Sequence, residues 1–90
     1  MADIRREINR LDEVLIPLLV ERLSYVGKAA DFKAQRQDVV VPWRIEEVVQ
    51  RAAQKAESLG GDPYIVERIW RALVDVSIAH EGRQWDRRSD

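Results

Sequence analysis

The feature that most constrains this chain is the stretch Asp3–Arg36, in which apolar side chains recur at alternating steps of four and three residues. The positions on this seam are Ile4, Ile8, Leu11, Leu15, Leu18, Arg22, Tyr25, Ala29 and Phe32. Such a heptad favours one long helix that packs against another helix along its whole length. A helix of about 30 residues would span about 45 Å, well beyond the diameter of a compact globule of this size. We therefore expect a second copy of the chain to cover it, in a homodimer.

Pro17 lies in the middle of this stretch, where it removes the hydrogen bond to the carbonyl of Glu13 and favours a kink. Two helices separated at Pro17 are the alternative to one kinked helix. The apolar period keeps its phase across Pro17, so we predict one kinked helix. Asp3 is the predicted N-cap, since a carboxylate there accepts a free N–H of the first turn.

Two further helices are predicted from their end signals. A β-branched run before Pro42 predicts a loop over about residues 36–42, because a residue before proline avoids the helical region. The second helix begins at Pro42 or Trp43 and ends at Gly60-Gly61, since glycine is typical of the C′ position. We expect its inner stripe to be Ile45, Val48, Val49, Ala52, Ala53, Ala56 and Leu59.

Asp62 followed by Pro63 predicts the start of the third helix, with an acidic N-cap and proline at the first helical position. This helix is expected over about residues 63–86, before a frayed tail. Its inward side chains are expected to be Val66, Ile69, Trp70, Leu73, Val74 and Ile78. The fold class is therefore all-α, a three-helix chain in which residues 1–90 form a single domain.

The composition excludes several classes of function. Fifteen Lys and Arg against sixteen Asp and Glu leave a net charge of −1, so the chain has no broad basic field for nucleic acid or an anionic membrane. It has no cysteine, which excludes disulfides, thiolate metal sites and cysteine nucleophiles. No apolar run approaches the roughly 18 residues of a membrane span, and the N-terminus lacks a signal-peptide core. We expect a cytoplasmic protein.

Polar side chains interrupt or border all three apolar stripes. They are Arg22, Lys33, Arg44, Ser77 and Glu81. Each has an ordinary explanation: Arg22 and Glu81 could form an internal ion pair, Lys33 could extend to solvent, Ser77 could bond its own backbone and Arg44 could be solvated. Together they leave an excess of positive charge on inner faces, which a dianionic ligand would neutralise.

Helix geometry separates these cations into two groups. Lys33 follows Arg22 by eleven residues and would share its face in a continuous helix, since eleven residues return to within about 20°. Arg5 precedes Arg22 by seventeen residues, about 25 Å along the axis and roughly 100° around it. One small ligand cannot contact both arginines, so Arg5 could join only an anion site on the partner chain.

His80 is the only histidine, and the sequence offers no metal-ligand spacing, phosphate loop or Ser-His-Asp set. A lone histidine is more often a surface residue than a catalyst. The residues therefore indicate a dimeric helical protein with a cationic, partly apolar pocket for a small carboxylate-bearing molecule. A non-catalytic module that binds a metabolite or a partner helix is a further possibility at this point.

The sequence resembles the small all-α chorismate mutase family, including its relatives the isochorismate pyruvate lyases. The resemblance covers nearly the whole chain, through IRREINRLDEVLIPLLVER, YVGKAADFKA, VPWR and YIVERIWRALVDVSIAHE. It implies an intertwined, domain-swapped homodimer with two active sites, each completed by Arg5 of the partner. By the same resemblance, Arg5 and Arg22 would bind the substrate carboxylates, Arg44 would border the ligand, and Ser77 would line the pocket.

The resemblance also implies the activity, which is the pericyclic rearrangement of chorismate to prephenate in the shikimate pathway, toward aromatic amino acids. Lys33 would donate a hydrogen bond to the ether oxygen whose bond breaks, and Glu81 would face that oxygen from the other side. The substrate is a small dicarboxylate, and the reaction needs no cofactor, metal or nucleophile.

Three features favour the lyase as an alternative activity, converting isochorismate to salicylate and pyruvate. Ile45 stands where typical mutases have a glutamate that holds the ring hydroxyl, although a one-residue change of register would place Glu46 there. AADFKA and Trp85 near the C-terminus also look more like the lyases.

Overall fold

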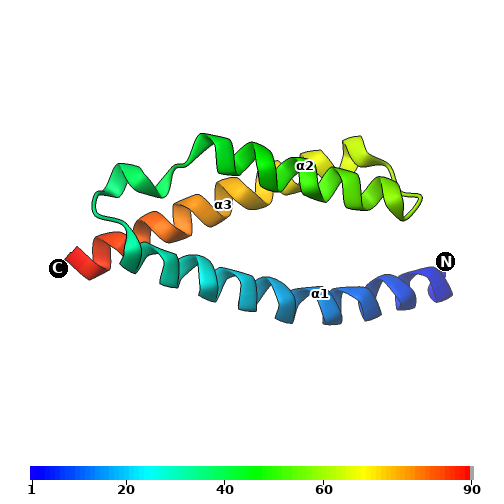
Figure 1. Cartoon of the computed structure of the whole chain (residues 1–90). Coiled ribbons are helices and arrows are strands. Elements are labelled where there is room, and N and C mark those ends of the chain that lie inside the picture. The colour runs from blue at the N-terminus through cyan, green and yellow to red at the C-terminus, as the bar shows by residue number, and fades with distance from the viewer. Residues whose placement is uncertain (90) are drawn as a thin grey trace.

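The computed structural model describes residues 1–89, which form α-helices and short 3₁₀ turns without a strand (Figure 1). The elements in chain order are α1 (Ala2–Ala29), a 3₁₀ turn (Ala30–Phe32), a second 3₁₀ turn (Arg36–Val39), α2 (Pro42–Ser58) and α3 (Pro63–Ser89). The predicted all-α, three-helix fold is thereby confirmed for this part of the chain. None of the helices described is long and apolar enough to cross a membrane.

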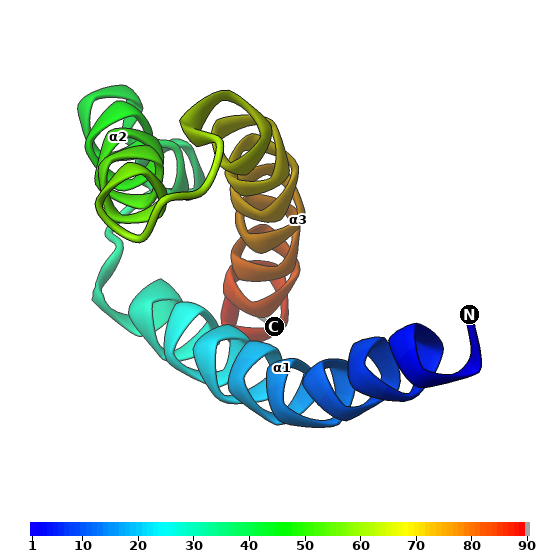
Figure 2. The ribbon, with the colours of Figure 1, turned by 90° about the vertical axis from the view of Figure 1, so that its right-hand side faces the viewer.

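The three helices form an elongated molecule. α2 and α3 pack as an antiparallel pair, and the C-terminal half of α1 lies along the C-terminal half of α3 (Figure 1). Toward its N-terminus α1 curves away from that pair (Figure 2). The principal extents are 50 × 25 × 14 Å and the radius of gyration is 15.7 Å, against about 12 Å for a compact domain of this length. The N-terminal part of α1 therefore lies away from the rest of residues 1–89, and no residue of α1 is buried.

The ends of α2 and the start of α3 follow the predicted signals. Pro42 occupies the first turn of α2. Gly60 has a φ of 80°, and the Gly60 and Gly61 N–H groups donate to the carbonyls of Glu57 (3.0 Å) and Ala56 (2.8 Å), which closes α2 in a Schellman motif. Asp62 Oδ1 accepts a hydrogen bond from the Tyr64 N–H at 2.9 Å, as expected of an N-cap.

α1 differs from its prediction at both ends. Pro17 lies inside a continuous helix, as predicted, but the helix stops at Ala29 rather than Arg36. Lys33 is extended, with φ −96° and ψ 127°, because its backbone bonds to the end of α3 instead of to a further helical turn. Phe32 is consequently 88% exposed and is not on a helical seam. Met1 is the N-cap, and Asp3 lies in the first turn.

The C-terminal residues are helical, so the prediction of a frayed tail is wrong for the residues up to 89. Asp86 forms an ion pair with Arg36 at 2.9 Å, and Arg88 Nη1 donates to the carbonyl of Asp31 at 2.8 Å. These partners lie 50 and 57 positions apart in the sequence, beyond the reach of a local signal. Asp90, the last residue of the predicted tail, lies outside the described residues.

The buried core is small and sits between α2, α3 and the connecting segment. Its apolar members are Ala30, Val39, Val49, Ala53 and Val74. Leu59 and Ile69, which the stripe pattern placed inward, are 72% and 55% exposed, because α2 and α3 bury only the central part of each stripe. No residue of α1 is buried, so a single chain leaves its longest apolar face uncovered.

Candidate active site

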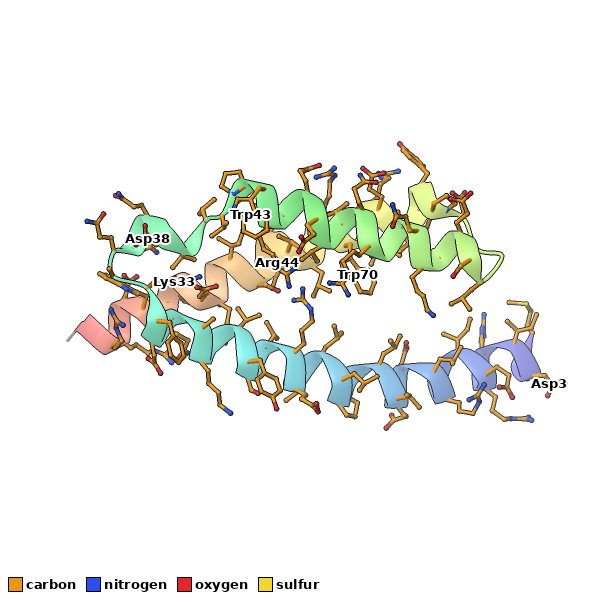
Figure 3. All side chains as sticks on the ribbon, viewed as in Figure 1. Asp3, Lys33, Asp38, Trp43, Arg44 and Trp70 are labelled. Carbon is orange, nitrogen blue, oxygen red and sulfur yellow. The ribbon has the colours of Figure 1, made fainter. Side chains whose placement is uncertain are left out.

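A pocket of about 390 Å³ lies between the C-terminal half of α1, the start of α2 and the second half of α3. The 3₁₀ segments that join α1 to α2 close one side of it. It is lined by all the predicted site residues except Arg5: Arg22, Lys33, Arg44, Ile45, Ser77 and Glu81. Figure 3 shows Lys33 near the C-terminal end of α1 and Arg44 near the start of α2, whereas Asp3 marks the distant end of α1. The structure thus brings together polar residues from three separate helices.

Arg22 is held on the pocket wall by Ser77. Its Nη1 donates to Ser77 Oγ at 2.8 Å, and Ser77 Oγ in turn donates to the carbonyl of Leu73 at 2.7 Å. Burial lowers the pKa of Arg22, and the nearby positive charge of Arg44 lowers it further. The guanidinium still carries its charge, since the ordinary pKa lies far above neutrality. Arg22 therefore presents its remaining donors to the pocket with no carboxylate partner in the described part of the chain.

Lys33 faces Glu81 across the pocket. Their closest atoms, Lys33 Nζ and Glu81 Oε2, are 3.8 Å apart, close enough for an ion pair but too far for a hydrogen bond. Glu81 Oε2 is buried and accepts no hydrogen bond within residues 1–89. Burial raises the pKa of Glu81, and the charge of Lys33 opposes that rise. Burial thus favours the protonated form of Glu81 relative to an exposed glutamate, while Lys33 favours the ionised form.

The start of α2 places neighbouring side chains in different environments. Ile45 lines the pocket, whereas Glu46 accepts two hydrogen bonds from Arg71 of α3, at 2.8 and 3.0 Å, on the outer surface. Those bonds lower the pKa of Glu46. Arg44 pairs with exposed Glu47 while bordering the pocket. The register places the aliphatic Ile45, and not Glu46, toward the pocket.

Arg5 lies apart from this site. It is exposed on the first turns of α1 and lines none of the three pockets described for the chain. The helix between Arg5 and Arg22 is continuous, so the separation of about 25 Å along the axis holds. A single chain cannot bring Arg5 and Arg22 to one small ligand.

The sequence reasoning missed part of the pocket wall. Val39 and Val41 line it from the connecting segment, which was predicted only as a loop. Their signal was present, because three successive valines in a loop indicate burial. Arg51 and Trp70 border a neighbouring cavity of about 320 Å³, which shares Arg22 and Arg44 with the pocket. The spacing of seven between Arg44 and Arg51 places them on one face of α2 and would have identified it.

The arrangement suits a small anion with an apolar body. Arg22 and Arg44 supply positive charge on the side of the neighbouring cavity, while Lys33 and Glu81 lie away from that cavity. Valine and isoleucine side chains form much of the wall between them. Within residues 1–89, no group of three His, Cys, Asp or Glu side chains is placed to hold a metal ion.

Comparison with known proteins agrees with this geometry. Residues 4–82 match the chorismate mutase type II family model. The isochorismate pyruvate lyase of Pseudomonas aeruginosa is 32% identical over 85 residues, which cover 94% of this chain and 84% of that protein. Since the family match covers most of the chain, including all of α2, most of α1 and α3 and every residue of the pocket, this chain belongs to the chorismate mutase type II family.

Proposed function

We propose that this protein is a chorismate mutase, which rearranges chorismate to prephenate in the pocket between its three helices. The observation that carries the proposal is the placement of Arg22 and Arg44 toward one side of an apolar pocket, and of Lys33 facing Glu81 away from it. The two carboxylates of chorismate and its ether oxygen need these two kinds of group. The family match over residues 4–82 supports the mutase as the first candidate.

The reaction is pericyclic, so the side chains hold the substrate and stabilise charge. Arg22, fixed by Ser77, grips a carboxylate through its fork of donors. Lys33 donates to the ether oxygen as negative charge develops there, and protonated Glu81 donates to the same oxygen beside it. A millionfold acceleration corresponds to about 8 kcal/mol, which a few preorganised charged contacts and a restricted substrate can supply.

We further propose that the active unit is an intertwined homodimer. The apolar side chains along the first half of α1 are uncovered in one chain. A second chain packed on them would bring its own Arg5 to the Arg22 side of the pocket. The partner subunit's Arg5 would then complete the grip on the substrate carboxylates, and all 90 residues would act as one domain within that assembly.

A second candidate is the isochorismate pyruvate lyase reaction, favoured by Ile45 and by the similarity to the lyase of Pseudomonas aeruginosa. Ile45 cannot hydrogen-bond the ring hydroxyl of chorismate. Isochorismate carries its hydroxyl at another ring position, so an aliphatic side chain here need not penalise it. Both reactions use the same carboxylate and ether contacts.

The test is turnover of chorismate and isochorismate with identification of the products. Formation of prephenate supports the mutase, whereas faster formation of salicylate and pyruvate supports the lyase. If a folded dimer turns over neither substrate, the protein is instead a non-catalytic binding module. Lys33→Ala should abolish either reaction, and Lys28→Ala is the matched control, because Lys28 lies over the Tyr25 ring and does not line the pocket.

A further inference from the structure

The segment that carries Lys33 has no helix or strand of its own to hold it. Lys33 follows the 3₁₀ turn Ala30–Phe32 in an extended conformation, and its N–H donates to the carbonyl of Ala30 at 3.2 Å. Its carbonyl oxygen accepts two hydrogen bonds from the end of α3, from Trp85 Nε1 at 3.1 Å and from Arg88 Nη2 at 2.9 Å. The backbone of Lys33 is thus fixed by residues more than 50 positions later.

Arg88 bridges two points of this segment. Its Nη1 donates to the carbonyl of Asp31 at 2.8 Å while Nη2 donates to that of Lys33. The guanidinium carbon lies 5.4 Å from the centre of the Trp85 ring, so the two donors stack on each other. A planar fork that binds two carbonyls two residues apart fixes the curvature of the chain between them. A lysine ammonium has no such fixed spacing of donors.

A third contact lies just beyond Lys33. Arg36 binds Asp86 through Nε at 2.9 Å and Nη2 at 3.4 Å. To do so it crosses α3 at Gly82, where an added Cβ would lie only 2.9 Å from Arg36 Nη2. The absent side chain of Gly82 therefore provides the space that the Arg36–Asp86 pair occupies.

One face of α3 contacts both the side-chain ammonium and the backbone carbonyl of Lys33. Glu81 and Trp85 are four residues apart and so lie one turn from each other on the same side of the helix. Glu81 faces the ammonium of Lys33 at 3.8 Å, and Trp85 binds its carbonyl at 3.1 Å. A displacement of about 1 Å at a reacting centre can cost about a hundredfold in rate. The distance between Lys33 Nζ and Glu81 depends on where the Lys33 backbone is held, and thus on the hydrogen bonds that Trp85 and Arg88 donate to its carbonyl.

We propose that Trp85, Arg88 and the Arg36–Asp86 ion pair are positioning residues that hold Lys33 at the distance from Glu81 that the reaction requires. We call this set the C-terminal clamp. The inference rests on the proposed function for its kinetic consequence, while its effect on the order of residues 31–36 stands apart from any activity.

The experiment compares Trp85→Phe and Arg88→Lys with the wild type in the full-length protein. Each variant keeps its stacking body or charge but loses a bond to the Lys33 carbonyl or the Asp31–Lys33 bridge. We expect kcat to fall about tenfold with KM within about twofold, since Lys33 acts mainly on the transition state. Amide hydrogen exchange over residues 31–36 should quicken about tenfold. Arg87→Lys, at the exposed neighbour, should change neither quantity.

A charge exchange provides the rescue. Arg36→Asp and Asp86→Arg should each lower kcat, and the double variant should recover at least half of the lost rate. Faster exchange with unchanged kcat would overturn the catalytic role, and unchanged exchange would overturn the clamp itself. If the wild type turns over neither substrate, the proposed function fails, and the exchange measurements still decide whether the clamp orders the segment.

Discussion

The two halves of α1 carry one heptad pattern but lie in different environments. In the first half, the seam residues are between 49% and 58% exposed; they are Ile4, Ile8, Leu11, Leu15 and Leu18. We call these five the α1 stripe. In the second half, the seam residues Arg22, Tyr25 and Ala29 line the pocket; Arg22 bonds to α3, while Tyr25 is still 64% exposed. The same periodicity thus produces a wall of the pocket in one half and an uncovered surface in the other.

This contrast teaches that amphipathic spacing predicts a covered face without saying what covers it. α3 reaches only the C-terminal half of α1, because α1 curves away from α2 and α3 toward its N-terminus (Figure 2). An exposed stripe of large aliphatic side chains is unusual for a monomer and typical of an interface. The predictions below test whether a second chain makes the two halves of α1 equivalent.

The largest effect is expected from a charge in the α1 stripe. Leu11→Glu would bury an unpaired carboxylate in the proposed dimer interface, so the dimer should dissociate and activity should fall about a thousandfold or more. Sedimentation velocity and turnover measure the two effects. Arg10→Glu is the matched control one residue away, since exposed Arg10 pairs with exposed Glu7 on its own helix. If the Leu11→Glu protein is monomeric and fully active, the α1 stripe is not needed for activity.

The next effect concerns arginines from the two halves of α1. Arg5→Ala and Arg22→Ala should each lower kcat/KM about a hundredfold, because each removes a charged carboxylate contact. Equal amounts of Arg5→Ala and Arg22→Ala protomers, allowed to exchange, should recover about a quarter of the wild-type activity. About half of the dimers then contain one protomer of each kind, and one of the two sites in such a dimer keeps both arginines. Lack of recovery in proven heterodimers would contradict a shared site. Arg22→Lys should still cost at least about tenfold, as a point charge lacks the fork.

Within the pocket, pH tests the proton on Glu81. Burial raises the pKa of Glu81 above its ordinary value, so the acid form persists to higher pH than that of an exposed glutamate. Only the acid form can donate to the ether oxygen; kcat should therefore fall about tenfold per pH unit once the pH exceeds this pKa. Glu81→Gln should flatten the profile. An active Gln variant with the wild-type pH dependence would exclude Glu81 as the donor.

The smallest effect is expected at Ile45, on the α2 wall opposite α1. Ile45→Glu should raise mutase efficiency relative to lyase efficiency by about two- to tenfold, which corresponds to a net hydrogen bond of about 0.5–1.5 kcal/mol. Kinetics with chorismate and isochorismate on both proteins provide the ratio. Glu46→Gln is the control for a change in local charge, because Glu46 binds Arg71 outside the pocket. An unchanged ratio for Ile45→Glu would show that this position does not select the reaction.

Local signals predicted the parts of the fold that depend on a few neighbouring residues. Pro42, Gly60 and the Asp62-Pro63 pair bound their helices as predicted, because caps and turns are satisfied by backbone groups one to five residues away. Pro17 was likewise correctly placed in a single helix. The end of α1 was not correctly predicted, since the Lys33 carbonyl accepts hydrogen bonds from the distant residues Trp85 and Arg88.

The candidate site shows the same division. Polar residues on apolar stripes identified Arg22, Ser77 and Glu81, which do line one pocket. Lys33 was included for the wrong geometric reason, since it reaches the pocket from an extended segment and not from the face of a helix. The internal ion pair that the sequence suggested for Arg22 and Glu81 is absent among the described residues: Arg22 bonds Ser77, and Glu81 faces Lys33.

The sequence by itself determined which faces of the helices are apolar, where α2 and α3 begin, and which charged side chains lie among apolar neighbours. These properties follow from helical periodicity and from hydrogen bonds within one turn. Tertiary contacts decided that α1 ends at Ala29, that the end of α3 holds the Lys33 backbone, and that Glu46 pairs with Arg71 outside the pocket. Those outcomes depend on donors and acceptors from distant segments competing for the same backbone groups, and chain order alone does not rank such competitors.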